Sequence, residues 1–307
     1  MENISIVDRE DRQIPDILDT YADKLDDIID VSSLLLDRYL KKNIMSDDKL
    51  VPVLFFRNAL EYVDSVSILV RNSSIEPIKA INRILLENLF QFEYLLEKDV
   101  ENRSYAFLVW DIKQKLSFYK KIDKDSDGNK PFKKLINKDK LLEDISVLDN
   151  ISVTSLIQRY SEILKLDGYK EANIEYEKTK KKNKFSPNWY SLYSGPKNVS
   201  DLAKNLNRTA HYEIFYREMS NNIHSTDIFK NKLVSKHNIS YLTKLRNPFE
   251  ADKVIKDTLN FLMSMVIIFL DELLPEEFEN FVQWYASFKD FFVDIGMKED
   301  FIVAGTN

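Results

Sequence analysis

Glycine scarcity is the feature that most limits what this chain can fold into, because only five glycines occur among its 307 residues. Average proteins contain roughly 7% glycine, about four times as much. Tight hairpins use glycine for positive φ, so turn-rich β folds are disfavoured. Phosphate-binding loops need closely spaced glycines, whereas these stand far apart, at positions 128, 168, 195, 296 and 305. Strand-like alternation is also almost absent, and the chain is therefore expected to be all-α.

The remaining composition narrows the class of protein. Hydrophobic residues make up 44% of the chain and aromatic residues 12%, which supplies enough apolar surface for a sizeable core. The chain contains no cysteine, which excludes disulfides, thiolate zinc sites and cysteine nucleophiles and suits a cytoplasmic protein. Only three histidines are present. We expect neither a metal nor a cofactor.

Charge and hydropathy limit the partners. The chain has 44 Lys and Arg against 50 Asp and Glu, a formal charge of −6. This balance argues against strong non-specific nucleic-acid binding but allows a local patch to contact RNA. The most apolar window, Leu259 to Leu274, is interrupted by Asp271 and Glu272. Its apolar core is shorter than the roughly 20 residues that span a bilayer. We therefore expect a buried helix here, no membrane span and a cytoplasmic location.

Apolar residues recur at helical spacing along most of the chain. Residues 1–45 are expected to form N-terminal helices packed on the core, with two short helices over 8–42. Residues 46–307 are expected to form the main helical domain, with 120–200 as an insertion or variable region and 249–293 as C-terminal core helices. The pattern predicts further helices over 48–71, 76–97, 101–122, 139–149, 151–166, 199–206, 209–226, 249–274 and 276–293.

Two stretches are predicted to be non-helical. Polar residues and a turn at Asp127-Gly128 indicate a loop over 120–140. Proline and glycine indicate a connector over 185–198. The first stretch also contains Asp123, Asp125 and Asp127 before a glycine, like the start of a calcium loop, but position 12 is Lys134 instead of Glu. We interpret it as an acidic turn.

A lysine run at 178–184, with five lysines in seven residues, follows three glutamates. Such runs are usually solvated faces, and the alternative is a supporting surface for nucleic acid. Two Arg-x3-Glu pairs also occur on neighbouring predicted helices, Arg57 with Glu61 and Arg83 with Glu87. Spacing of i, i+4 allows an intrahelical ion pair, and the alternative is that one pair lines a polar cleft.

The segment 209–226 carries the most informative pattern. With 100° per residue, Arg217 and His224 lie within about 20° of each other. Ser220 and Asn221 fall between them, so the helix has one polar stripe, opposite Tyr212, Phe215, Met219 and Ile223. Arginine supplies a permanent cation for a phosphate, and histidine moves protons near neutral pH. These parts suffice for RNA cleavage in which a base activates the ribose 2′-OH.

The same residues resemble a known family. An all-helical chain with Arg-x6-His near a helix end is similar to the HEPN superfamily, whose motif is Arg followed by His after four to six residues. More narrowly, Arg83-x3-Glu87 followed by Tyr216-Arg217-x2-Ser220-x3-His224 resembles a bacterial HEPN-like family of unknown function, over roughly residues 50–230. The resemblance implies a HEPN-like helical bundle with additional N- and C-terminal helices, which forms a homodimer through its motif helices.

The resemblance also implies an activity, which is metal-independent RNA cleavage in a cleft shared by two Arg/His pairs, in toxin or antiviral-defence settings. His224 would be the general base or acid, and Arg217 would stabilise the phosphate and the transition state. Supporting roles fall to Ser220, Asn221, Tyr216, Arg83 and Glu87. The implied partners are an RNA substrate, a second copy, and a neutralising or activating protein.

One residue departs from the pattern. Glu218 follows the motif arginine, where active HEPN nucleases often have Asn, Asp or His. A carboxylate at this position would repel a phosphate. Glu218 and the acidic total charge favour a second hypothesis, a non-catalytic helical scaffold or sensor that binds a partner protein or nucleotide through the same face. The Arg-Ser-Asn-His stripe favours the nuclease.

Overall fold

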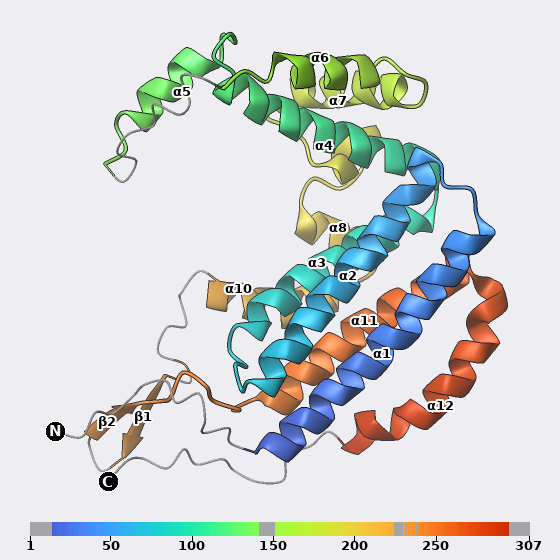
Figure 1. The fold of residues 1–307 in the computed structure, drawn as a ribbon, viewed down its shortest axis with the longest axis vertical. Helices are drawn as coiled ribbons and strands as arrows, with labels where there is room; N and C mark the ends of the chain where they lie inside the picture. The colour runs from blue at the N-terminus through green and yellow to red at the C-terminus, as the bar shows by residue number, and fades with distance from the viewer. Residues whose placement is uncertain (1–13, 141–150, 224–229, 231, 237–238, 295–307) are drawn as a thin grey trace. The chain divides into compact units, whose positions relative to one another are not determined.

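The structure, a computed structural model, describes residues 14–140, 151–223, 230, 232–236 and 239–294. These residues are predominantly helical, which confirms the all-α prediction (Figure 1). They also include a short antiparallel hairpin that the sequence pattern did not predict, formed by β1 (Leu233–Lys236) and β2 (Ile239–Leu242). None of the helices within these ranges is long and apolar enough to cross a membrane.

The chain divides into two compact units. The first comprises residues 1–45, 52–97 and 199–307, and the second comprises 46–51 and 98–198. The first unit contains the motif residues. The second contains most of the region 120–200 that was expected to be an insertion.

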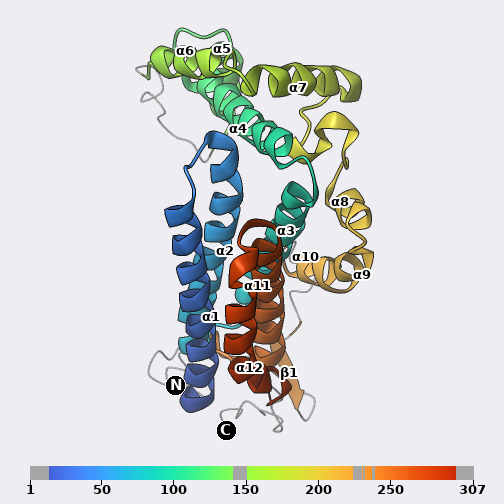
Figure 2. The same ribbon diagram turned by 90° about the vertical axis from the view of Figure 1, so that its right-hand side faces the viewer.

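Five long helices form the body of the first unit. They are α1 (Pro15–Lys42), α2 (Asp47–Arg71), α3 (Ile78–Glu97), α11 (Ala251–Leu273) and α12 (Phe278–Asp294), which begins after a short 3-10 turn, η4 (Pro275–Glu277). In Figure 2 helices α1, α2, α11 and α12 run in nearly the same direction, side by side. Contacts between aromatic rings join four of these helices. Phe56 of α2 stacks on Phe269 of α11, with 4.4 Å between the ring centroids. Tyr39 of α1 packs against Phe269, and Phe92 of α3 packs against Phe56.

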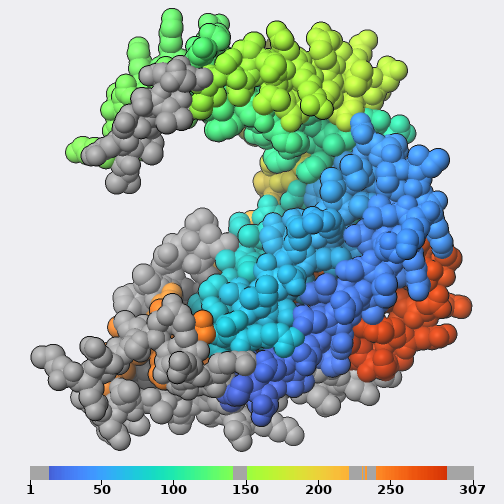
Figure 3. All heavy atoms as spheres, viewed as in Figure 1, coloured from blue at the N-terminus to red at the C-terminus, as the bar shows by residue number. Residues whose placement is uncertain are grey.

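Helix α1 corrects the prediction of two short helices over 8–42. It is a single helix of 28 residues, because its apolar spacing continues without glycine or an internal proline from Leu18 to Tyr39. It also meets η4, where Arg38 bonds Glu277 and Lys42 bonds Glu276. Further along, Lys24 of α1 lies over the ring of Phe288 of α12. The two helices lie in contact in the space-filling view (Figure 3).

Helices α3 and α11 are linked by buried polar side chains. The Nδ2 of Asn82 donates to the carbonyl of Val254 at 2.8 Å, and the hydroxyl of Thr258 donates to Oδ1 of Asn82 at 2.7 Å. Both side chains are almost fully buried. Because buried polar groups are costly unless they are paired, these bonds fix the register between the two helices. The apolar window at 259–274 is thus a buried core helix, as predicted.

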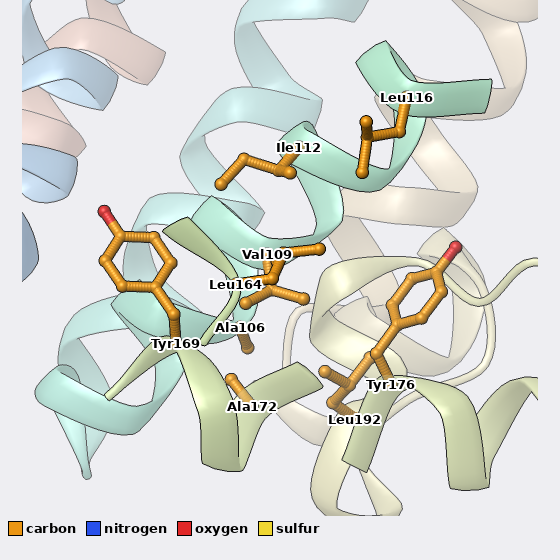
Figure 4. Close-up of a cluster of buried hydrophobic side chains, with 9 residues drawn as sticks. All are labelled: Ala106, Val109, Ile112, Leu116, Leu164, Tyr169, Ala172, Tyr176 and Leu192. Carbon is orange, nitrogen blue, oxygen red and sulfur yellow. The ribbon is translucent and has the colours of Figure 1, made fainter. Parts of the chain in front are cut away.

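The second unit has its own core around α4 (Val100–Ile122) and α7 (Tyr169–Asn183). Figure 4 shows the buried side chains that pack there, which are Ala106, Val109, Ile112, Leu116, Leu164, Tyr169, Ala172, Tyr176 and Leu192. Gly168 precedes α7 with φ of 79°, and a Cβ at this position would lie 2.4 Å from the ring of Tyr105. Glycine is therefore required here both for its backbone conformation and for this close approach.

Three predictions for the second unit are changed or untested. The loop predicted over 120–140 contains a helix, α5 (Asn129–Ile136), whose buried Ile136 anchors it. The connector predicted over 185–198 includes a 3-10 segment, η2 (Trp189–Ser194), held by the buried ring of Trp189. Helix α6 (Thr154–Ile163) lies within the helix predicted over 151–166. The helix predicted over 139–149 falls almost entirely outside the described residues.

Candidate functional site

The motif segment is not the single helix that was predicted over 209–226. After α8 (Val199–Asn205), the chain forms α9 (Thr209–His211), a π-helical turn, η3 (Tyr212–Tyr216), and α10 (Arg217–Ile223). A π-turn inserts an extra residue into a helix and occurs frequently at functional sites. Positions before Arg217 are therefore rotated relative to the uniform helical register. Residues 224–226 lie outside the described residues.

The Arg83-x3-Glu87 segment and the later segment that begins at Tyr216 come together in space, because α10 packs on α3. Arg83 of α3 is the centre of the contact. Its Nε donates to the Ser220 hydroxyl at 3.0 Å, and its Nη2 donates to the Tyr216 hydroxyl at 2.5 Å. The guanidinium also lies 4.5 Å from the centroid of the Tyr216 ring, a cation–π distance. One arginine thus bonds both residues of the later patch that face it.

Glu87 completes the group one helical turn further along α3. The Tyr216 hydroxyl donates to Oε2 of Glu87 at 3.4 Å, and Nη1 of Arg83 lies 3.9 Å from the same oxygen. We call Arg83, Glu87, Tyr216 and Ser220 the Arg83 cluster. The side chains of Arg83 and Glu87 are 22% and 30% exposed, so the cluster is half-buried. Charges in such a place are stable only when they are paired.

Burial raises the pKa of the Tyr216 phenol, the negative charge of Glu87 raises it further, and Arg83 opposes the rise. The phenol therefore stays protonated at neutral pH. Because it accepts from Arg83 and donates to Glu87, it links the cation to the carboxylate in one short chain of hydrogen bonds.

Arg57 and Glu61 of α2 show what the same spacing does without a partner helix. They form an ion pair of 2.8 Å with both side chains more than half exposed. The two Arg-x3-Glu sequences are therefore not equivalent: one is a solvated pair, and the other is built into a contact between helices.

Arg217 lies outside the Arg83 cluster. Its side chain is 66% exposed, and Nη1 donates to Oε2 of Glu213 at 2.7 Å. This hydrogen bond raises the pKa of the guanidinium, so the residue is permanently charged. The predicted stripe is divided here, since Ser220 faces α3 while Arg217 pairs with a residue one turn earlier on the solvent side.

Glu218 has cationic partners that its position in the sequence did not reveal. Its carboxylate accepts from Nζ of Lys253 on α11 at 2.8 Å and lies 3.5 Å from Nζ of Lys230. Burial acts to raise its pKa, but these two lysines hold it below the ordinary value. The negative charge expected to repel a phosphate is therefore compensated. Lys253 stands 35 residues away, so no local spacing could have indicated the pair.

Asp257, one turn along α11 from Lys253, is a further group that the sequence did not single out. Burial raises its pKa to about 6, Lys253 opposes the rise and Glu218 adds to it. Asp257, Glu218 and Lys253 line one small recess with Asn82 and Met219. A carboxyl group with a pKa of about 6 therefore lies beside α10.

Two predicted residues, Asn221 and His224, are described by the structure only in part or not at all. Asn221 belongs to α10 by its backbone, but its side chain lies outside the described residues, as does all of His224. His211 is half-buried beside Phe215, and burial together with the charge of Arg208 lowers its pKa. Arg208 itself is bound by Glu93 at 3.0 Å.

The aspartates that resembled a calcium loop have a structural role in part. Asp123 is buried, and its Oδ1 accepts from the backbone N–H of Val153 at 3.1 Å and from the hydroxyl of Thr154. It therefore ties the start of α6 to the end of α4. Within the described ranges, no group of three or more His, Asp or Glu side chains could hold a metal ion.

Comparison with known proteins places these residues inside a family match. The family described as "Family of unknown function (DUF5677)" matches residues 49–241, more than half of the chain. The matched range contains all four members of the Arg83 cluster and also Arg217 and His224. No curated protein and no solved structure matches the chain.

Proposed function

The chain belongs to DUF5677, a family of unknown function, and we propose that it is a metal-independent endoribonuclease of the HEPN type, with Arg217 and His224 as its catalytic residues. The observation that carries the proposal is the contact between Arg83 and the pair Tyr216 and Ser220. These are the residues through which the two separate sequence patches resemble one HEPN-like pattern. A pattern whose distant halves bond each other is more specific than the spacing of Arg217 and His224 alone.

In this proposal the Arg83 cluster positions the catalytic residues and does not react. Its hydrogen bonds hold the first turn of α10 against α3 and therefore set where Arg217 and the residues after it are presented. A residue that is misplaced by about 1 Å can cost a hundredfold in rate, so such support matters for catalysis.

Arg217 is available to a phosphate. The ion pair between Arg217 and Glu213 is exposed to solvent and therefore contributes little, and a bidentate phosphate contact is stronger. Glu218 does not offer a competing free charge, because Lys253 and Lys230 compensate it. The residue that departs from the HEPN pattern is therefore compatible with phosphate binding.

The proposed reaction is an internal transfer within RNA. His224 removes the proton from a ribose 2′-OH, and the 2′ oxygen forms a bond to the adjacent phosphorus. The bond from phosphorus to the 5′ oxygen of the next nucleotide breaks, and that oxygen takes up a proton. The products are a 2′,3′-cyclic phosphate and a 5′-OH end. Arg217 stabilises the negative charge that develops on the phosphoryl oxygens. We further propose that two copies form a shared cleft in the cytoplasm, in a toxin or antiviral-defence role with a neutralising or activating protein partner.

The alternative is a scaffold or sensor without catalysis, which binds a partner protein or nucleotide through the same face. The acidic total charge of −6 favours it, because an acidic protein repels RNA as a whole. The two functions differ in whether RNA is cut.

The test is incubation of the purified protein with total RNA in the presence of a chelator, with fragment ends identified chemically. We expect fragments with cyclic phosphate ends, and a loss of at least about 100-fold in rate for Arg217→Ala and His224→Ala. Arg57→Ala, which removes another exposed arginine held in an i, i+4 ion pair with a glutamate, is the matched control and should cleave normally. Intact RNA with the wild-type protein, alone and with its neighbouring gene products, would exclude the nuclease and favour the scaffold.

A further inference from the structure

Charge is divided unequally between the two compact units. The second unit, residues 46–51 and 98–198, holds 22 Lys and Arg against 17 Asp and Glu, a formal charge of +5. The rest of the chain holds 22 against 33, a formal charge of −11. The total of −6 therefore conceals a basic unit inside an acidic protein. Such asymmetry is typical of chains in which one part contacts a polyanion.

The excess positive charge is concentrated at the end of α7. Four exposed lysines stand there, which are Lys180, Lys181, Lys182 and Lys184. In the part of the chain that the structure describes, none of their ammonium groups has an ion-pair or hydrogen-bond partner. We call these four residues the lysine surface.

Two of the three glutamates that precede the lysine run do not neutralise the lysine surface. Glu175 pairs with Lys178 at 3.0 Å and accepts from Thr179. Glu177 pairs with Lys113 of α4 at 2.6 Å. These carboxylates are therefore occupied by other lysines.

Stabilisation of the helix end does not account for the lysine surface. The C-terminus of a helix carries about half a negative charge, which one nearby cation satisfies. Four lysines within five positions exceed this requirement and repel one another. Their accumulation is instead expected where a polyanion supplies the missing negative charge.

The surroundings favour nucleic acid over a membrane. Phe185 follows directly and is 61% exposed, and exposed aromatic rings beside lysines bind single-stranded nucleic acid by stacking on its bases. A membrane-binding helix needs a free apolar face. The apolar face of α7 is instead buried in the core of the second unit through Tyr169, Ala172 and Tyr176.

We propose that the lysine surface, with Phe185, binds the backbone of single-stranded nucleic acid as a docking surface outside the Arg83 cluster. That the nucleic acid is RNA rests on the proposed function. The docking surface would raise the local concentration of RNA for a protein whose other unit repels it.

The test compares two double variants of the full-length chain with the same change in charge. Lys181→Gln with Lys182→Gln removes half of the lysine surface. The control, Lys115→Gln with Lys165→Gln, removes two lysines of the same unit that are paired with Asp111 and Glu162. Both are made on a His224→Ala background, and binding of a fluorescein-labelled oligouridylate is measured by fluorescence anisotropy across a series of salt concentrations.

We expect the first variant to bind about 25-fold more weakly at 0.1 M salt, with a salt-dependence slope smaller by about 1.4, and the control to change less than about twofold. If both variants lose the same affinity for the oligouridylate, binding depends on net charge alone, and the proposal that the lysine surface is the docking site is overturned. Absence of RNA binding would overturn it too, as would binding only to phosphatidylserine vesicles. Binding without cleavage by the wild-type protein would leave the lysine surface standing and reject the nuclease.

Discussion

Arg83 and Ser220 are 137 positions apart in the sequence, and Nε of Arg83 donates to the Ser220 hydroxyl at 3.0 Å. The same guanidinium bonds and stacks on Tyr216. Without these partners, the half-buried Arg83 would lose more free energy by desolvation than its 3.9 Å ion pair with Glu87 restores. The contact between α3 and α10 therefore depends on all three residues, and each can be tested separately.

Tyr216→Phe should destabilise the first unit. The variant keeps the ring under the guanidinium but removes the hydroxyl between Arg83 and Glu87. Both charged groups then lose a partner in a half-buried place, which costs about 1–2 kcal/mol of unfolding free energy. Urea unfolding followed by circular dichroism measures the change. Arg57→Ala, which removes an exposed ion pair, should cost no more than about 0.5 kcal/mol. Equal losses in the two variants would show that the hydroxyl is not a structural link.

Much of the helical framework follows from spacing alone. The start and end of α2, α3, α4 and α11 were predicted to within a few residues, because apolar periodicity is unambiguous over 20 residues or more. Helix α1 was divided in two by the prediction, although no glycine or proline interrupts it. The helix α5 lies in a stretch too short and too rich in lysine for periodicity to detect.

The site was predicted in part. The resemblance assigned supporting roles at one site to four residues, which are Arg83, Glu87, Tyr216 and Ser220. In the structure these four residues are in contact. The orientation of Ser220 toward Arg83 was not predicted, because it depends on the packing of α10 on α3, which no local pattern encodes. The compensation of Glu218 by Lys253 depends on packing between α10 and α11, which no local pattern encodes.

Gly168→Ala should destabilise the second unit. Gly168 has φ of 79°, and a Cβ would lie 2.4 Å from the Tyr105 ring. The positive φ alone costs about 1–3 kcal/mol for a residue with a Cβ, and the ring must also move. Thermal unfolding should show the loss. Combining Gly168→Ala with Tyr105→Ala relieves the clash but leaves the backbone cost, so the second substitution should add less than it does in the wild-type background. Full additivity would contradict the close approach.

Asp257→Asn should change how stability depends on pH. Burial raises the folded-state pKa of Asp257 from 3.8 to about 6. Protonation therefore favours folding: this contribution is complete below about pH 4 and is lost as the pH rises through 6. Asparagine does not titrate, so the variant should gain about 2 kcal/mol relative to wild type between pH 4 and pH 8. Urea unfolding at both pH values gives the difference, and an equal difference at the two values would contradict the assignment.

Glu213→Gln should release Arg217 for phosphate binding. The pair is exposed on both sides, at 66% and 49%, so its loss should leave the unfolding free energy nearly unchanged. If Arg217 acts on RNA, a phosphate no longer competes with the carboxylate, and cleavage at low substrate concentration should rise by about two- to fivefold at low salt. Glu61→Gln, which frees Arg57 from a pair of the same spacing, is the matched control and should have no effect on cleavage. A fall in cleavage with Glu213→Gln would show instead that the carboxylate holds Arg217 in the position it needs for catalysis.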